Sequence, residues 1–294
     1  MRARRSLLAL LGAWALVAGF TLAGTANVAA KAGHAASRGP SGVAMPVGNT
    51  PGWKQVFKDD FKGNELDSKW NKYNGVVGGG LGGWWARSHA VVRDGELVLE
   101  TYSDPAACKN AASCALFNNE VSGGAKTKFA MTYGKVLVRV KTTPVADVSF
   151  LGLLWPVTDI APPETDFIVE GGPDHLTTIG AMLKYLGTGS TGPSGPTGAT
   201  GTTGPVIVPN SVTAKAAKWH TVGVIWSKGE LQYTIDGHVW ATEINPSVSS
   251  VPSNIVLQSQ TTCQAVAGQA CTAPWAAVEP NVDIAWVVAY KPHK

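Results

Sequence analysis

The chain has 294 residues, of which 45% are hydrophobic and 15% charged, a composition that excludes a disordered polyelectrolyte and is typical of a packed globular protein. Three of its 24 Lys and Arg residues lie in residues 1–30, and 20 Asp and Glu residues nearly balance the rest. A near-neutral chain gives no reason to expect nucleic acid or a membrane surface as a partner.

Residues 1–30 have the three-part pattern of a secretory signal peptide. Basic residues at Arg2, Arg4 and Arg5 precede an uncharged apolar run at 7–22, and small residues follow. The run is short for a membrane span, which needs about 20 residues, and an uncleaved anchor is the alternative. We therefore expect a secreted protein in which residues 31–52, rich in Ala, Gly, Ser and Pro, form a flexible leader.

From residue 53 onward, short β-rich runs are separated by Gly, Asn, Asp or Pro, as in strands joined by turns. Asp94-Gly95 and Asp236-Gly237 are hairpin signals. The expected strands are 90–92, 96–101, 133–141, 148–155, 165–169, 219–226, 230–235, 238–242, 255–260 and 282–290. Because no strand–helix–strand units occur, we predict an all-β jelly-roll sandwich of two antiparallel sheets, one of which can provide a cleft for a polymer.

Glycine recurs at every third position from Gly189 to Gly204. Such a repeat is typical of collagen, but it is short and nothing else in the chain indicates a trimer. We expect an inserted loop in a monomer. Gly187, Gly189 and Gly192 also match a dinucleotide-binding pattern, without the strand and helix that this pattern requires.

Four cysteines form two local pairs, Cys108 with Cys114 and Cys263 with Cys271. In an exported chain these pairs predict two disulfides. Four buried thiols are the alternative, and zinc is disfavoured because neither pair has a two-residue spacing or a neighbouring His. We expect no metal and no cofactor.

Three acids interrupt the apolar segment 164–170. Glu164 and Asp166 are two residues apart and point to one face of the predicted strand. Acids on a core strand cost desolvation free energy unless their face lines a solvated cleft. Neighbouring carboxylates also push their pKa values apart, as cleavage of a glycosidic bond requires. Solvated acids at a strand end are the alternative interpretation.

Aromatic and amide side chains near the predicted strand ends are candidates for binding sugar. An exposed indole can stack on a sugar ring, although a Trp packs more often in the core. Gln258 and Gln260 alternate on one strand and either bind hydroxyl groups or face solvent. The candidate substrate-binding residues are Trp84, Trp85, Arg87, Trp155, Gln258 and Gln260.

An ordered set of short segments resembles glycoside hydrolase family 16, the laminarinase and lichenase group. The segments are Asp-Asp-Phe (59–61), Gly-Trp-Trp-Ala-Arg (83–87), Arg-Asp-Gly-Glu-Leu-Val-Leu (93–99), Tyr-Gly-Lys (133–135), Leu-Trp-Pro (154–156), Glu-Thr-Asp-Phe (164–167), Trp-His-Thr (219–221) and Val-Asp-Ile-Ala-Trp-Val (282–287). The similarity covers residues 53–294. It implies a concanavalin A-like jelly roll and retaining hydrolysis of β-glucan-type polysaccharide, or transfer between such chains.

The family motif is Glu-x-Asp followed by a second Glu, so the resemblance assigns Glu164 as nucleophile, Asp166 as the residue that tunes it and Glu170 as acid/base. The family's second Glu lies two or three residues after the Asp, where this chain has Ile168 and Val169. Six residues of flat strand span about 20 Å, whereas retaining carboxyl groups lie about 5–5.5 Å apart. We therefore predict a bulge at 168–169 that brings Glu170 into the cleft.

Two other functions are compatible with the sequence. The first is a secreted carbohydrate-binding protein of the same fold with little or no catalysis. The second is a structural surface protein that displays the Gly repeat. Release of reducing sugar separates the hydrolase from the binding protein, and glycan affinity separates both from the structural protein.

Overall fold

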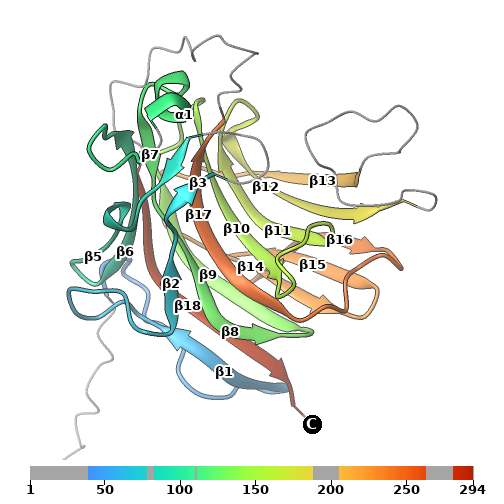
Figure 1. Ribbon diagram of the computed structural model, residues 1–294. Coiled ribbons are helices and arrows are strands. Elements are labelled where there is room, and N and C mark those ends of the chain that lie inside the picture. The colour runs from blue at the N-terminus through green and yellow to red at the C-terminus, as the bar shows by residue number, and fades with distance from the viewer. Residues whose placement is uncertain (1–38, 78–82, 110, 188–204, 263–280, 294) are drawn as a thin grey trace, which may run out of the picture. The chain divides into compact units, whose positions relative to one another are not determined.

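The computed structural model describes residues 39–77, 83–109, 111–187, 205–262 and 281–293 (Figure 1). The predicted signal peptide, residues 31–38 of the leader, the Gly repeat and the Cys263–Cys271 pair lie outside the described residues. Among the residues described, no helix has the length and apolar character needed to cross a membrane.

Two sheets account for the described strands, and they pack face to face (Figure 1). The smaller sheet has seven described strands, all paired antiparallel. Their spatial order is β13 (Pro205–Thr213), β12 (His175–Leu186), β11 (Glu164–Gly171), β10 (Val148–Pro156), β17 (Ser253–Thr261), β8 (Gly124–Met131) and β2 (Trp70–Lys72).

The larger sheet has eleven strands in the described part of the chain. Its main path is β16 (His238–Ile244), β15 (Glu230–Ile235), β14 (His220–Ser227), β9 (Gly134–Thr142), β18 (Asn281–Pro292), β6 (Glu96–Ser103), β7 (Glu120–Ser122), β4 (Trp84–Trp85) and β3 (Gly75–Val76). Off this path, β1 (Trp53–Asp59) pairs with β18, and β5 (Ala90–Arg93) pairs with β6. Short helical segments are η1 (Arg87–His89) and α1 (Ala111–Leu116). The predicted jelly-roll sandwich is confirmed.

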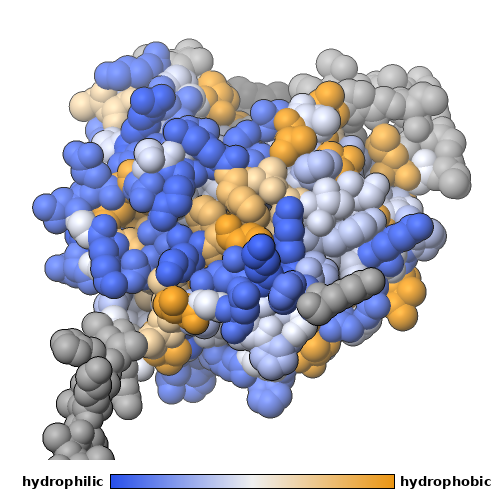
Figure 2. All heavy atoms as spheres, turned by 90° about the horizontal axis from the view of Figure 1, so that it is seen from below, coloured by the Kyte–Doolittle hydropathy of each residue, from blue (hydrophilic) through white to orange (hydrophobic). Residues whose placement is uncertain are grey.

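Alternating apolar residues of both sheets form one core between them. Val136, Val138 and Val140 of β9 are at most 1% exposed and share this core with Phe150 and Leu154 of β10. Full burial of such a side chain contributes about 1.5–3 kcal/mol. Seen from below, hydrophilic side chains dominate the surface and apolar ones form smaller patches between them (Figure 2). The other face of the seven-stranded sheet points away from this core, and we call it the cleft face.

Residues 39–52, expected to belong to a flexible leader, instead contact the outer face of the larger sheet. Arg139 donates to the carbonyl oxygen of Ser41 at 3.3 Å, and the Trp286 indole donates to that of Val43 at 3.1 Å. Thr50 also forms a β-bridge with Trp53. These contacts use backbone carbonyls, which every residue carries, so the side-chain pattern gave no sign of them.

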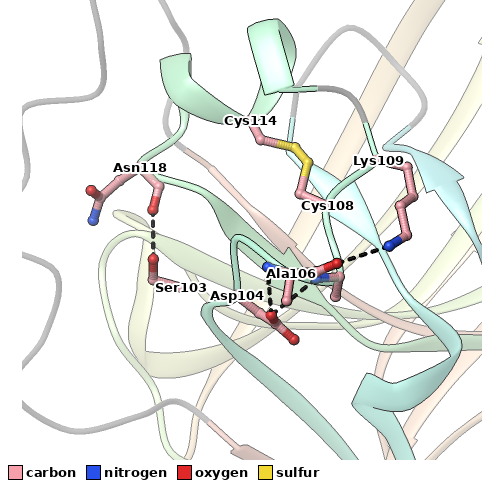
Figure 3. The surroundings of a disulfide bond; sticks show 8 residues. Ser103, Asp104, Ala106, Cys108, Lys109, Cys114 and Asn118 are labelled. Atoms are coloured by element: carbon pink, nitrogen blue, oxygen red, sulfur yellow. Dashed lines mark hydrogen bonds between the residues drawn. A yellow bond between two sulfur atoms is a disulfide. The ribbon is translucent and has the colours of Figure 1, made fainter.

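The structure contains the predicted Cys108–Cys114 disulfide, in the segment between β6 and β7 (Figure 3). The carboxylate of Asp104 accepts hydrogen bonds from two backbone N–H groups of the turn that follows it. Ser103 Oγ donates to the carbonyl oxygen of Asn118 at 2.9 Å, which ties the two ends of the segment together.

Candidate active site

A cavity of about 470 Å³ opens on the cleft face of the seven-stranded sheet. Four of the predicted substrate-binding residues line it, namely Trp85, Trp155, Gln258 and Gln260. Trp84 and Arg87 are absent from its lining, and Arg87 is exposed. Six other lining residues were not predicted from the sequence: Tyr73, Lys126, Leu151, Leu153, Asp159 and Lys184.

The strands place these residues together by their two-residue alternation. Leu151, Leu153 and Trp155 follow one another on the cleft face of β10, and Gln258 and Gln260 do the same on the adjacent β17. The Gln258 amide donates to the side-chain oxygen of Gln260 at 2.9 Å. The floor of the cavity therefore combines apolar side chains with an ordered pair of amides.

Aromatic side chains stand at two sides of this floor. The ring of Trp85 lies 4.8 Å from that of Tyr73, and its Nε1 donates to the backbone carbonyl oxygen of Ser259 at 2.8 Å. Trp155 Nε1 donates to Asp159 Oδ1 at 3.0 Å. Both indoles are thus held in fixed orientations, which lowers the entropy cost of stacking a sugar ring on them.

Asp159 also connects two strands across the cleft face. Lys126 of β8 donates from Nζ to Asp159 Oδ1 at 2.6 Å, and this hydrogen bond lowers the pKa of the Asp159 carboxyl. Burial, together with the charge of Asp159, raises the pKa of the Tyr73 phenol, which therefore stays neutral. The polar groups at this end of the cavity are consequently a bound ion pair and a neutral hydroxyl.

Glu164 and Asp166 lie together on the cleft face and share one cation. Lys184 stands opposite Glu164 in β12, with its Nζ 2.7 Å from Glu164 Oε1 and 3.0 Å from Asp166 Oδ2. Glu164 reaches the cavity, whereas Asp166 is fully buried behind it. Burial and the neighbouring Glu164 raise the pKa of Asp166 well above its usual range. Burial opposes the charge of Lys184, but the two acids outweigh it and raise the Lys184 pKa.

β11 contains a bulge, as predicted, but at Phe167 and Ile168 rather than at 168–169. Asp166 pairs with Leu153 of β10, and Ile168 pairs with the very next residue, Gly152, so two steps on β11 oppose one step on β10. Phe167 and Ile168 consequently both enter the core and are 0% exposed. Gly152 makes room for this arrangement, since a Cβ there would lie 2.9 Å from the Ile168 side chain.

The bulge does not bring Glu170 into the cleft, and this part of the prediction is corrected. One extra residue reverses the alternation of the strand. Val169 therefore shares the cleft face with its partner Leu151, while Glu170 points into the core beside Phe150. The Glu170 carboxyl is 1% exposed and accepts a hydrogen bond from Thr142 of the opposite sheet. Burial raises its pKa to about 7, and the Thr142 hydrogen bond partly opposes this shift.

Lys184, the charged residue beside the two acids, was not predicted from the sequence. It lies in β12, which was not among the predicted strands, although Ala181 and Leu183 alternate there with Met182 and Lys184. A cation on the polar side of such a run, one strand after an acidic pair, is a sequence signal for an ion pair. In the part of the chain that is described, no group of three or more His, Cys, Asp and Glu side chains is placed to hold a metal ion.

Comparison with solved structures identifies the class of fold. An endo-acting O-glycanase from human gut microbiota that initiates mucin breakdown superposes with a TM-score of 0.65 at 18% identity, over 84% of this chain and 94% of the other. SCLam, a non-specific endo-β-1,3(4)-glucanase from family GH16, superposes with a TM-score of 0.63 at 19% identity, over 85% of this chain and 95% of the other. A Bacteroides ovatus mixed-linkage glucan GH16 protein in complex with a product superposes with a TM-score of 0.60 at 19% identity, over 79% of this chain and 99% of the other.

The chain therefore has the fold of the family 16 laminarinases, lichenases and endo-glucanases. At these low identities the similarity establishes the fold and leaves the activity to be argued from the site. No family model matches the chain, and no curated protein matches it by sequence.

Proposed function

We propose that the cavity on the cleft face binds a β-glucan-type polysaccharide and that the protein cleaves it with Glu164 as nucleophile. The observation that carries this proposal is the position of Glu164, whose carboxylate reaches an aromatic-lined cavity, pairs there with Lys184 and has a second acid, Asp166, buried behind it. The fold supports it, because structures with this fold include endo-glucanases. The predicted signal peptide and the Cys108–Cys114 disulfide support export of the protein to an oxidising compartment.

The side chains of the cavity match the surface of a glucan. Trp85 and Trp155 offer faces for stacking on sugar rings, and Gln258 and Gln260 offer donors and acceptors for hydroxyl groups. In a retaining reaction the nucleophile attacks the anomeric carbon while a second group protonates the leaving oxygen. On β11 that second group is missing, because Val169 stands at the family's position and Glu170 faces the core.

A binding protein with little or no catalysis is the second candidate function. The specific observation in its favour is that Val169 occupies the place on the cleft face where the family motif has an acid. Such a protein would use the same aromatic and amide side chains for affinity and would leave the glycan intact.

The test uses purified protein lacking residues 1–30 with laminarin, lichenan, agarose and mucin. We expect binding and release of reducing sugar from at least one β-glucan. Glu164→Gln should abolish release while leaving affinity within a few-fold of the original. The control is Glu65→Gln, which changes an exposed acid outside the cavity. Affinity without release would support the binding protein, and absence of any affinity would overturn both candidates.

A further inference from the structure

The imidazole of His175 lies on the cleft face of β12, directly over Gly180. A Cβ atom on residue 180 would lie 2.5 Å from Cε1, 2.8 Å from Nε2 and 3.0 Å from Nδ1 of His175. No side chain fits at such distances, so the ring occupies the place where a side chain would stand. Ile179 and Ala181 point into the core, so the side of Gly180 that the ring covers is the cleft face.

A large irregularity in the pairing of β11 with β12 puts the ring there. Val169 pairs with Gly180, and Gly171 pairs with His175, so two steps along β11 oppose five along β12. The extra residues loop out, and the imidazole folds back over Gly180. His175 is half-buried and stands beside the cavity rather than in its lining.

This location is level with the position where the family motif has its acid/base. Because Gly180 pairs with Val169, the imidazole lies beside residue 169, displaced sideways by one strand, or about 4.8 Å. Val169 pairs in turn with Leu151, which lines the cavity. A sugar bound over Leu151 and Val169 therefore has the His175 ring as its lateral neighbour.

The hydrogen bonds of the ring define which nitrogen is available. His175 Nδ1 lies 2.9 Å from Thr178 Oγ1, and that hydroxyl donates its proton to the carbonyl oxygen of Asp174 at 3.3 Å. Since the hydroxyl proton is committed to Asp174, Nδ1–H is the donor to Thr178. Nε2 makes no hydrogen bond to the residues described, and it can accept or donate a proton.

We propose that His175 is the proton-transfer residue of this site, taking the role that Glu170 does not fill; the inference rests on the proposed hydrolysis. In the first step, protonated Nε2 gives its proton to the glycosidic oxygen as the bond from that oxygen to the anomeric carbon breaks and an oxygen of Glu164 bonds to this carbon. In the second step, neutral Nε2 takes a proton from water, whose oxygen bonds to the anomeric carbon and releases Glu164. Both residues return to their starting states.

The charges around the ring suit an acid that works below neutral pH. Burial lowers the pKa of His175, and the exposed Asp174 on the same turn partly opposes this. Glu164, Asp166 and Lys184 lie farther along β11 and β12 as one ion-paired group. Glu170 faces the core, on the opposite side of β11. Turnover should accordingly fall as the pH rises through the His175 pKa.

The test compares polysaccharide with an aryl β-glycoside that has a good leaving group, using protein without residues 1–30. His175→Ala should lower kcat on polysaccharide by roughly 100-fold or more, abolish the alkaline limb of the pH profile and spare the first step with the aryl substrate. Azide should then accelerate turnover and yield a β-glycosyl azide. His238→Ala, on an exposed edge strand, is the matched control and should change none of these readouts.

Two further variants separate a catalytic imidazole from a structural one. Gly180→Ala keeps the imidazole but displaces it, and should reproduce the loss of kcat; Thr178→Val should shift the alkaline limb with little change in KM. Full activity and an unchanged pH profile in His175→Ala would overturn the inference and leave the proposed hydrolysis intact. Absence of turnover by the wild type on both substrates would overturn the two together.

Discussion

The carboxyl group of Glu170 in β11 accepts a hydrogen bond from the hydroxyl of Thr142 in β9, so an acid and an alcohol join the two sheets inside the core. The folded protein binds a proton at Glu170 more tightly than the unfolded chain does, because burial raises its pKa from 4.5 to about 7. The stabilisation is fully present below pH 4.5 and is lost as the pH rises through 7.

We predict that Glu170→Gln flattens the dependence of stability on pH. For the wild type, this carboxyl should lower the free energy of unfolding by up to about 3 kcal/mol between pH 4.5 and 8, at 1.36 kcal/mol per pKa unit. Urea unfolding at several pH values measures this slope. Glu170→Gln should also leave turnover unchanged, because the side chain is outside the cavity. A large loss of kcat would show that Glu170 reaches the substrate.

Glu120 should also lower the free energy of unfolding as the pH rises, and over a wider pH range than Glu170. It is 3% exposed, neither carboxyl oxygen has a hydrogen-bond partner among the residues described, and burial together with Asp147 raises its pKa to about 9. Replacing a buried, unpaired acid with an apolar residue of similar size removes the cost of ionising it. Glu120→Met should therefore raise the Tm more at pH 9 than at pH 5. An equal change at both pH values would contradict the assigned cause.

Val169→Glu should place a carboxyl group on the cleft face at the position of the family's acid/base. We expect it to restore polysaccharide turnover in His175→Ala by at least 10-fold, since a positioned acid contributes about 10²–10⁴-fold. Val169→Gln has nearly the same size but no acidic proton, and it should give no rescue. Because Val169 is 5% exposed, the Tm of each variant must be compared before the rates are interpreted.

Lys184→Met should be destabilising because it leaves Glu164 and Asp166 without their cation. The loss of free energy of unfolding should approach about 3 kcal/mol at neutral pH, the lower end for breaking a buried pair. It should shrink at low pH, because Asp166, whose pKa is raised, is protonated there. Adding Glu164→Gln should recover part of the loss, and strict additivity of the two changes would contradict the coupling.

The sequence predicted the sandwich because strands such as β9 alternate between apolar residues that face the core and polar residues that face outward. It missed β12, whose first residues, His175 to Thr178, form an irregular segment without alternation. Trp85 and Trp155 were found because turn signals placed them near strand ends.

The acid/base position could not be derived from the sequence. A count of residues shows that a bulge is needed, but it does not show which residue forms the bulge. The packing of the His175 ring against Gly180 could not be predicted from the sequence either. A glycine in a strand shows that something approaches the backbone closely, and only the folded structure identifies the neighbour.

The bulge at Phe167 and Ile168 also has an evolutionary consequence. Because the bulge decides whether position 169 or 170 lies on the cleft face, this strand can gain or lose a cleft-facing acid through an insertion or deletion of a single codon. Removing Ile168 would leave Asp166 followed by Phe, Val and Glu, with the acid three residues after the aspartate. If Phe167 and Val169 then formed the bulge and both faced the core, the core-facing Glu170 would lie on the cleft face without any substitution.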